Sequence, residues 1–118
     1  MHAYIITSSS ANNRNKIIEE LLTDRTITAY DVITIVPDGL SIGIDAIRPL
    51  ASRLSLHPIG TSTHAVIIHD AHVLTQEAQN AMLKLLEEPP GEALIVLETP
   101  QPDALLPTIL SRCHIIRL

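Results

Sequence analysis

Five short apolar runs recur along the chain, and longer segments of mixed polarity separate them. The runs are Ala3–Thr7, Val32–Val36, Ala65–Ile68, Ala93–Leu97 and His114–Leu118. Within each run apolar residues mostly follow one another instead of alternating with polar ones, which is typical of strands that helices cover on both faces. The pattern therefore favours a parallel sheet.

The segments between the runs have helical periodicity. The predicted helices are Lys16–Leu22, Ile44–Leu54, Gln76–Glu88 and a short one from Pro102 to Leu110. Asn12 or Asn13 can cap the first helix, Thr75 can cap the third, and the third must end at Pro89. Alternating strands and helices predict an α/β fold with three layers, a doubly wound five-stranded parallel sheet and right-handed crossovers.

Composition narrows the range of functions. A chain of 118 residues is expected to form a single domain, and it contains no Trp or Phe that could stack on single-stranded nucleic acid. A net charge of −5 without a Lys/Arg cluster disfavours direct DNA binding. The lone Cys113 excludes an internal disulfide. Without a signal peptide or an apolar stretch of about 18 residues, we expect a cytoplasmic protein with no membrane partner.

Polar residues follow three of the predicted strands. Ser8–Asn15 follows the first strand, His69 and Asp70 follow the third, and Glu98 and Thr99 follow the fourth. Ligands of such sheets bind beyond the carboxyl ends of the strands. The sequence therefore predicts a site at this edge.

Two motifs in the second half of the chain indicate a family. The stretches IIHDAHVLTQEAQNAMLKLLEEPP (67–90) and LLPTILSRCHIIRL (105–118) resemble the AAA+ clamp-loader subunits of bacterial DNA polymerase III. Among them the chain looks most like the delta-prime subunits, with gamma/tau second, because its own nucleotide-binding motifs are altered while its S-R-C motif is intact. The resemblance implies that residues 1–118 form one P-loop NTPase core of the AAA+ type, without the helical lid, zinc module and collar domain of that family.

The phosphate-binding loop of that fold has the pattern G-x-x-x-x-G-K-[ST], in which glycines bring backbone N–H groups onto the phosphates. Aligned by the following helix, this chain has Ser8, Ser9, Ser10, Ala11, Asn12, Asn13, Arg14 and Asn15 instead. The segment contains no glycine, Arg14 replaces the lysine and Asn15 replaces the hydroxyl residue. The loop, known as Walker A, is degenerate, so we expect no bound ATP or Mg²⁺ cofactor.

The acidic box of the family, known as Walker B, is altered as well. The resemblance aligns His69 with the acid that orients Mg²⁺ and Asp70 with the acid that activates water, but imidazole is a poor ligand for so hard a cation. Thr99 matches the residue that senses the γ-phosphate, or it caps the loop 100–102. A metal site of His69, Asp70 and His72 is disfavoured, because neighbouring strand residues point to opposite faces, and no metal is expected.

Arg112 belongs to the S-R-C motif, Ser111, Arg112 and Cys113. In the family this arginine crosses a subunit interface and stabilises phosphoryl-transfer charge at the neighbour's site, as arginine fingers do. The resemblance thus implies a partner-binding role for the motif and a catalytic role in trans for Arg112. The alternative is a surface arginine before the last strand. Cys113 is expected to be a small buried hydrophobe, and Glu87 and Glu88 a solvated helix end.

The resemblance implies a clamp-loader subunit that does not hydrolyse ATP and acts through contacts with other loader subunits in a hetero-oligomer. Such a subunit would be no enzyme by itself, and it would reach DNA only through the complex. Two alternatives remain open. One is a weak ATPase that uses Arg14 and Asp70, and the other is a stand-alone α/β module with a different binding partner.

Overall fold

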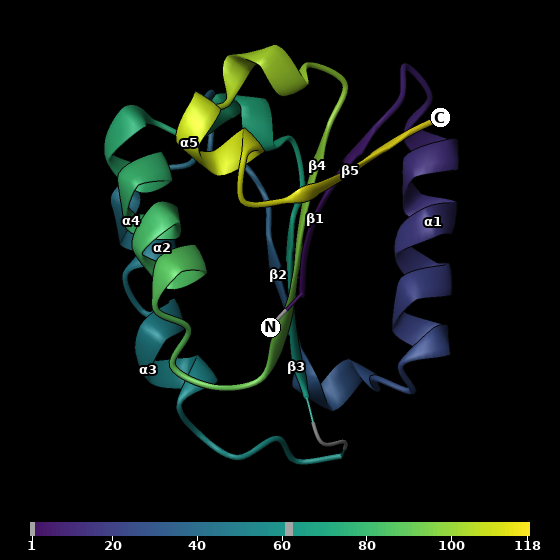
Figure 1. Ribbon diagram of the computed structural model, residues 1–118, viewed down its shortest axis with the longest axis vertical. Coiled ribbons are helices and arrows are strands. Elements are labelled where there is room, and N and C mark those ends of the chain that lie inside the picture. The colour runs from purple at the N-terminus through teal and green to yellow at the C-terminus, as the bar shows by residue number, and fades with distance from the viewer. Residues whose placement is uncertain (1, 61–62) are drawn as a thin grey trace.

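The computed structural model describes residues 2–60 and 63–118. Its strands are β1 (His2–Thr7), β2 (Val32–Ile35), β3 (His64–Ile68), β4 (Ala93–Thr99) and β5 (His114–Arg117). They form one parallel five-stranded sheet in the order β2-β3-β4-β1-β5 (Figure 1). The predicted fold class is confirmed.

The helices are α1 (Ala11–Asp24), α2 (Ile44–Ile47), α3 (Leu50–Leu54), α4 (Gln76–Glu87) and α5 (Pro107–Leu110). Helix α1 covers one face of the sheet, and the others lie on the opposite face (Figure 1). The strand order explains this division. The step from β1 to β2 crosses the sheet in one direction and the three later steps cross it in the other, so connections of one hand place α1 alone on its face.

Three predicted helices needed correction. Helix α1 begins at Ala11, and its N-cap is Ser10 instead of Asn12 or Asn13, because the Ser10 hydroxyl accepts a hydrogen bond from the Asn13 N–H at 3.3 Å. Prolines divide the other two. Pro49 separates α2 from α3, and Pro107 begins α5 after a separate 3-10 turn, η3 (Pro102–Ala104).

Helix α4 is positioned by its cap and by one buried amide. The predicted cap is confirmed, since the Thr75 hydroxyl accepts a hydrogen bond from the Ala78 N–H at 3.1 Å. The Gln79 amide accepts from the Leu106 N–H at 2.7 Å and donates to the Ala104 carbonyl at 3.4 Å. These bonds tie α4 to the segment that leads into α5 and the S-R-C motif.

The core consists of two apolar clusters, one on each face of the sheet. The larger lies under α2 to α5 and includes Ile5, Val66, Ile95 and Met82, and the smaller lies under α1 and includes Ile6, Ile67 and Ile18. Within residues 2–60 and 63–118, no helix is long and apolar enough to cross a membrane.

Candidate functional site

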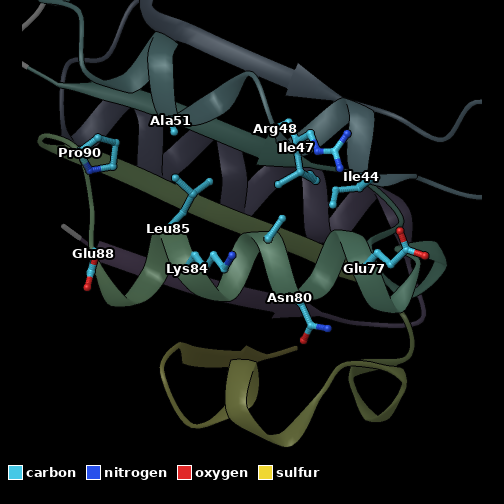
Figure 2. A pocket seen from close by; sticks show the side chains of 11 residues that line it. Ile44, Ile47, Arg48, Ala51, Glu77, Asn80, Lys84, Leu85, Glu88 and Pro90 are labelled. Atoms are coloured by element: carbon cyan, nitrogen blue, oxygen red, sulfur yellow. The ribbon is translucent and has the colours of Figure 1, made fainter.

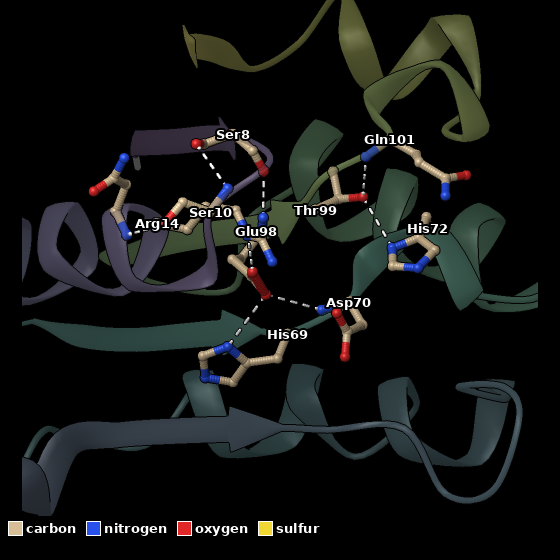
Figure 3. A network of polar contacts seen from close by, with 10 residues as sticks. Ser8, Ser10, Arg14, His69, Asp70, His72, Glu98, Thr99 and Gln101 are labelled. Atoms are coloured by element: carbon tan, nitrogen blue, oxygen red, sulfur yellow. Dashed lines mark hydrogen bonds and ion pairs between the residues drawn. The ribbon is translucent and has the colours of Figure 1, made fainter. Parts of the chain in front are cut away.

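Glu98 is the centre of a polar cluster at the carboxyl edge of the sheet (Figure 3). It is the second-last residue of β4, not a residue after the strand as predicted, and its register with β1 is Ile6↔Glu98. Arg14 forms an ion pair with its Oε2 atom. On Oε1, the Asp70 N–H donates a hydrogen bond at 3.1 Å and His69 Nδ1 lies at 3.4 Å.

Arg14 is buried together with its partner Glu98. The residue is 6% exposed and Glu98 is 3% exposed. From the first turns of α1 the guanidinium reaches both the Glu98 carboxylate and the carbonyl of Ser8. A buried charge is stable only when it is paired and hydrogen-bonded, and here each charge satisfies the other.

Hydrogen bonding sets the charge state of the cluster. Burial by itself raises the pKa of Glu98, but the hydrogen bonds from His69, Arg14 and the Asp70 N–H together outweigh burial and lower that pKa to about 2. The hydrogen bond with Glu98 raises the pKa of His69, against the opposing effect of burial. At neutral pH Glu98 is therefore an anion held by cationic and neutral donors.

The segment Ser8–Asn15 divides between a loop and a helix. Only Ser8, Ser9 and Ser10 connect β1 to α1, and Ala11 to Asn15 lie in the first turns of α1. Inside this short connection the Ser10 N–H bonds to the Ser8 hydroxyl at 3.1 Å. Together with the Ser10 cap, this bond directs two backbone N–H groups to serine hydroxyls of the same segment.

Asp70 and Thr99 lie beside Glu98, and they form different hydrogen bonds. Asp70 has a φ of 53°, a left-handed conformation that Asp tolerates better than most residues, and its N–H faces Glu98. The Thr99 hydroxyl accepts a hydrogen bond from the Gln101 N–H at 2.9 Å and lies 3.0 Å from His72 Nδ1. Among the described residues no group of three His, Cys, Asp or Glu side chains is arranged to hold a metal ion.

Arg112 lies outside the Glu98 cluster, in the connection from α5 to β5. Its Nη2 atom is 3.6 Å from Glu87 Oε2 at the end of α4, and the two side chains are 47% and 44% exposed. Glu87 is therefore more than a solvated helix end. Cys113 is partly buried against the core, and burial raises the pKa of its thiol to about 11, so the thiol is protonated at neutral pH.

A groove between α2, α3 and α4 is a second concave feature, with a volume of about 550 Å³ (Figure 2). Ile47 and Leu85 are among its apolar lining residues, Arg48 and Lys84 supply positive charge, and Glu77 and Glu88 supply negative charge. Because positive and negative side chains both line the groove, its charge favours neither anionic nor cationic ligands.

The sequence pattern predicted that Glu98 lies at this edge but indicated no role for it. A signal was present, since Glu98 is an acid at the end of an apolar run and a buried acid needs a cationic partner. Its partner Arg14 lies 84 positions away in the sequence. Periodicity and motif spacing do not identify a pair at that separation.

Comparison with known proteins places these features in a family. The family described as DNA polymerase III, delta subunit, matches residues 25–118. The chain is 39% identical over 90 residues to the DNA polymerase III subunit delta' of Escherichia coli (strain K12), and 40% identical over 84 residues to that of Bacillus subtilis (strain 168). These alignments cover 75% and 71% of this chain, but 27% and 26% of the relatives, so the chain spans about a quarter of their length.

A solved structure extends the match to the whole fold. The crystal structure of a DNA polymerase III gamma subunit-related protein from Thermotoga maritima superposes with a TM-score of 0.88 at 37% identity. The superposition covers 99% of this chain and 40% of that one. The resemblance to delta-prime and gamma/tau subunits is thus confirmed, as is the AAA+ type of α/β core. Because the family match covers most of its length, this chain belongs to the DNA polymerase III delta-subunit family.

Proposed function

We propose that the chain acts in DNA replication as a clamp-loader subunit of the delta-prime type that does not hydrolyse ATP. It contacts other loader subunits and presents Arg112 to the active site of a neighbouring ATPase. The observation that carries the proposal is the buried pair of Arg14 and Glu98. Arg14 aligns with the lysine that holds the phosphates in active relatives, and its charge is already matched inside the protein.

The connection from β1 to α1 supports the same conclusion. A phosphate cradle needs several successive N–H groups that point to one centre. Three residues link this strand to this helix, and the N–H groups of Ser10 and Asn13 bond to serine hydroxyls. This degenerate Walker A segment is too short and too internally bonded to wrap a triphosphate.

The alternative of a weak ATPase would depend on Arg14 and Asp70. Arg14 is engaged by Glu98 and Ser8, and His69, at the place of the Mg²⁺-orienting acid, is turned toward Glu98. An imidazole in such a pair offers no oxygen to the metal ion. The described contacts therefore favour a subunit without an ATP cofactor.

The exposure of Arg112 supports a role in trans. A half-exposed ion pair such as Arg112–Glu87 contributes about 1 kcal/mol or less to stability. The guanidinium can therefore leave Glu87 for a phosphate on a neighbouring subunit at small cost. Ser111 and Cys113 would flank it at that interface, and DNA would be reached only through the assembled complex.

A nucleotide titration tests the first half of the proposal. We expect a fluorescent ATP analogue with Mg²⁺ to show no saturable binding to the 118-residue chain at millimolar concentration. Saturable micromolar binding would contradict the proposal and favour the ATPase alternative.

The role of Arg112 is tested in a reconstituted loader in which only the neighbouring site can hydrolyse ATP. Arg112→Ala should lower turnover at that site on the order of 10³-fold or more, as loss of an arginine finger does, while the subunit still assembles. Arg53→Ala, which removes an exposed arginine of α3, is the matched control and should change nothing. Unchanged turnover in Arg112→Ala would refute the finger role, and failure to co-purify with any loader subunit would favour the stand-alone module.

A further inference from the structure

We propose that Glu98 occupies an oxyanion-binding site built into the carboxyl edge of the sheet, and that its own carboxylate excludes phosphate from that site. The donors come from two parts of the fold (Figure 3). Arg14 on α1 binds Oε2, while Oε1 faces His69 Nδ1 and the Asp70 N–H that follow β3.

This donor set is what an oxyanion receptor requires. A guanidinium, an imidazole and a backbone N–H converge on one carboxylate, and phosphate-binding sites use donors of the same kinds. The donors are also fixed in place. The left-handed backbone at Asp70 aims its N–H at the carboxylate, and the Ser8 carbonyl holds the Arg14 guanidinium from a second side.

Glu98 excludes an external anion in two ways. Its carboxylate already uses the donors, and because it is part of the chain it competes at a high effective concentration. An entering phosphate would also leave an ionised carboxylate buried beside a second negative charge. The Glu98 side chain is 4% exposed and that of Arg14 is 7% exposed, so water offers the displaced groups little compensation.

The inference rests on the proposed function in one respect, the absence of nucleotide binding, and it goes further by assigning the exclusion of phosphate from this edge of the sheet to one side chain. The variant Glu98→Ala tests it. The substitution removes the carboxylate and the neighbouring methylene, a group of the size of acetate, and it leaves all three donors in the chain. The emptied site should then accept an anion from solution.

The measurement is the midpoint of thermal unfolding of the 118-residue chain, followed by circular dichroism while inorganic phosphate replaces chloride at constant ionic strength. At a phosphate concentration about ten times the dissociation constant, the midpoint of Glu98→Ala should rise by roughly 5 °C. The midpoint of the unsubstituted chain should not change. If Glu98→Ala is unfolded in chloride, phosphate should refold it.

Two further variants serve as controls. Glu98→Gln fills the same space with an uncharged group, so phosphate should not stabilise it. In Glu98→Ala combined with Arg14→Gln the main cation is missing, and the phosphate effect should disappear.

Four outcomes would overturn the inference: no effect on Glu98→Ala, an equal effect on the unsubstituted chain, an unchanged effect in the double variant, or stabilisation of Glu98→Ala by acetate but not by phosphate. None of these depends on a loader partner. If the unsubstituted chain binds no nucleotide and Glu98→Ala binds no phosphate, this inference fails while the proposed function stands.

Discussion

At the scale of residues, the chemistry of the carboxyl edge depends on one carboxylate with three donors. Glu98 is contacted by Arg14, His69 and the Asp70 N–H, and Arg14 also donates a hydrogen bond to the Ser8 carbonyl. The partners of this carboxylate thus all come from the chain itself. Removal of Arg14 or Glu98 leaves the other charge buried without a counter-charge.

The pH dependence of stability should reveal the cluster. Because the folded pKa of Glu98 is lowered from 4.5 to about 2, its ionised form stabilises the fold above pH 4.5, and this contribution is lost as the pH falls toward 2. The loss should amount to roughly 3 kcal/mol, since one pKa unit corresponds to about 1.4 kcal/mol. The raised pKa of His69 works in the opposite sense, because its contribution is complete below pH 6.5 and is lost as the pH rises through the folded value.

Urea unfolding between pH 2 and pH 9 measures both effects. Glu98→Gln is the matched variant, and its stability should depend less on pH in the acid range and above pH 6.5. Equal pH profiles for the two chains would show that the cluster does not control stability.

At the scale of elements, a hydroxyl cap or a proline marks where α1, α4 and α5 begin. Ser10 begins α1, Thr75 begins α4, and Pro107 begins α5 at a position where a missing N–H costs nothing. Pro49 instead interrupts the segment 44–54. Strand β4 is longer than the predicted run, which ended at Leu97. It continues to Thr99 because β1 pairs with it up to Thr7.

The cap of α1 can be tested in isolation from the cluster. Ser10→Ala removes the oxygen that accepts the Asn13 N–H and should cost about 1 kcal/mol of unfolding free energy. Ser9→Ala changes an exposed neighbouring serine and should have an effect within about 0.5 kcal/mol. Urea unfolding of the two variants would contradict the assignment if their losses were equal.

At the scale of the whole molecule, Arg14 and Arg112 lie in different environments. Arg14 is buried inside the structure, while Arg112 lies in the connection from α5 to β5 and forms a half-exposed ion pair with Glu87. Arg14 thus contributes to the stability of the fold, whereas Arg112 is the residue of the proposed contact with a neighbouring subunit.

Substitution of each arginine should reflect this difference. Arg14→Met should lower the unfolding free energy by about 3–5 kcal/mol, because Glu98 is left as an unpaired buried charge. Arg112→Ala should lower it by about 1 kcal/mol or less, because its pair is half exposed. Denaturant unfolding of both variants checks the contrast, and equal losses would contradict it.

Local signals in the sequence are sufficient to predict the secondary-structure elements and the family. Continuous apolar runs mark the five strands, prolines and hydroxyl residues mark helix ends, and the motifs around Thr75 and Arg112 indicate the relatives. These signals are local, because a strand or a cap depends on residues a few positions apart. The starting residue of α1 and the division of segment 44–54 were harder to predict, since alternative caps and a tolerated proline compete there.

The arrangement of the candidate site, in contrast, depends on the packing of the sheet. The order β2-β3-β4-β1-β5 places β1 beside β4 and thereby brings Arg14 to Glu98 across 84 positions of sequence. The same order brings the Asp70 N–H, at the end of β3, to that carboxylate. A charge pair of this kind arises from strand order and burial, which are properties of the packed sheet and leave no periodic signal in the chain.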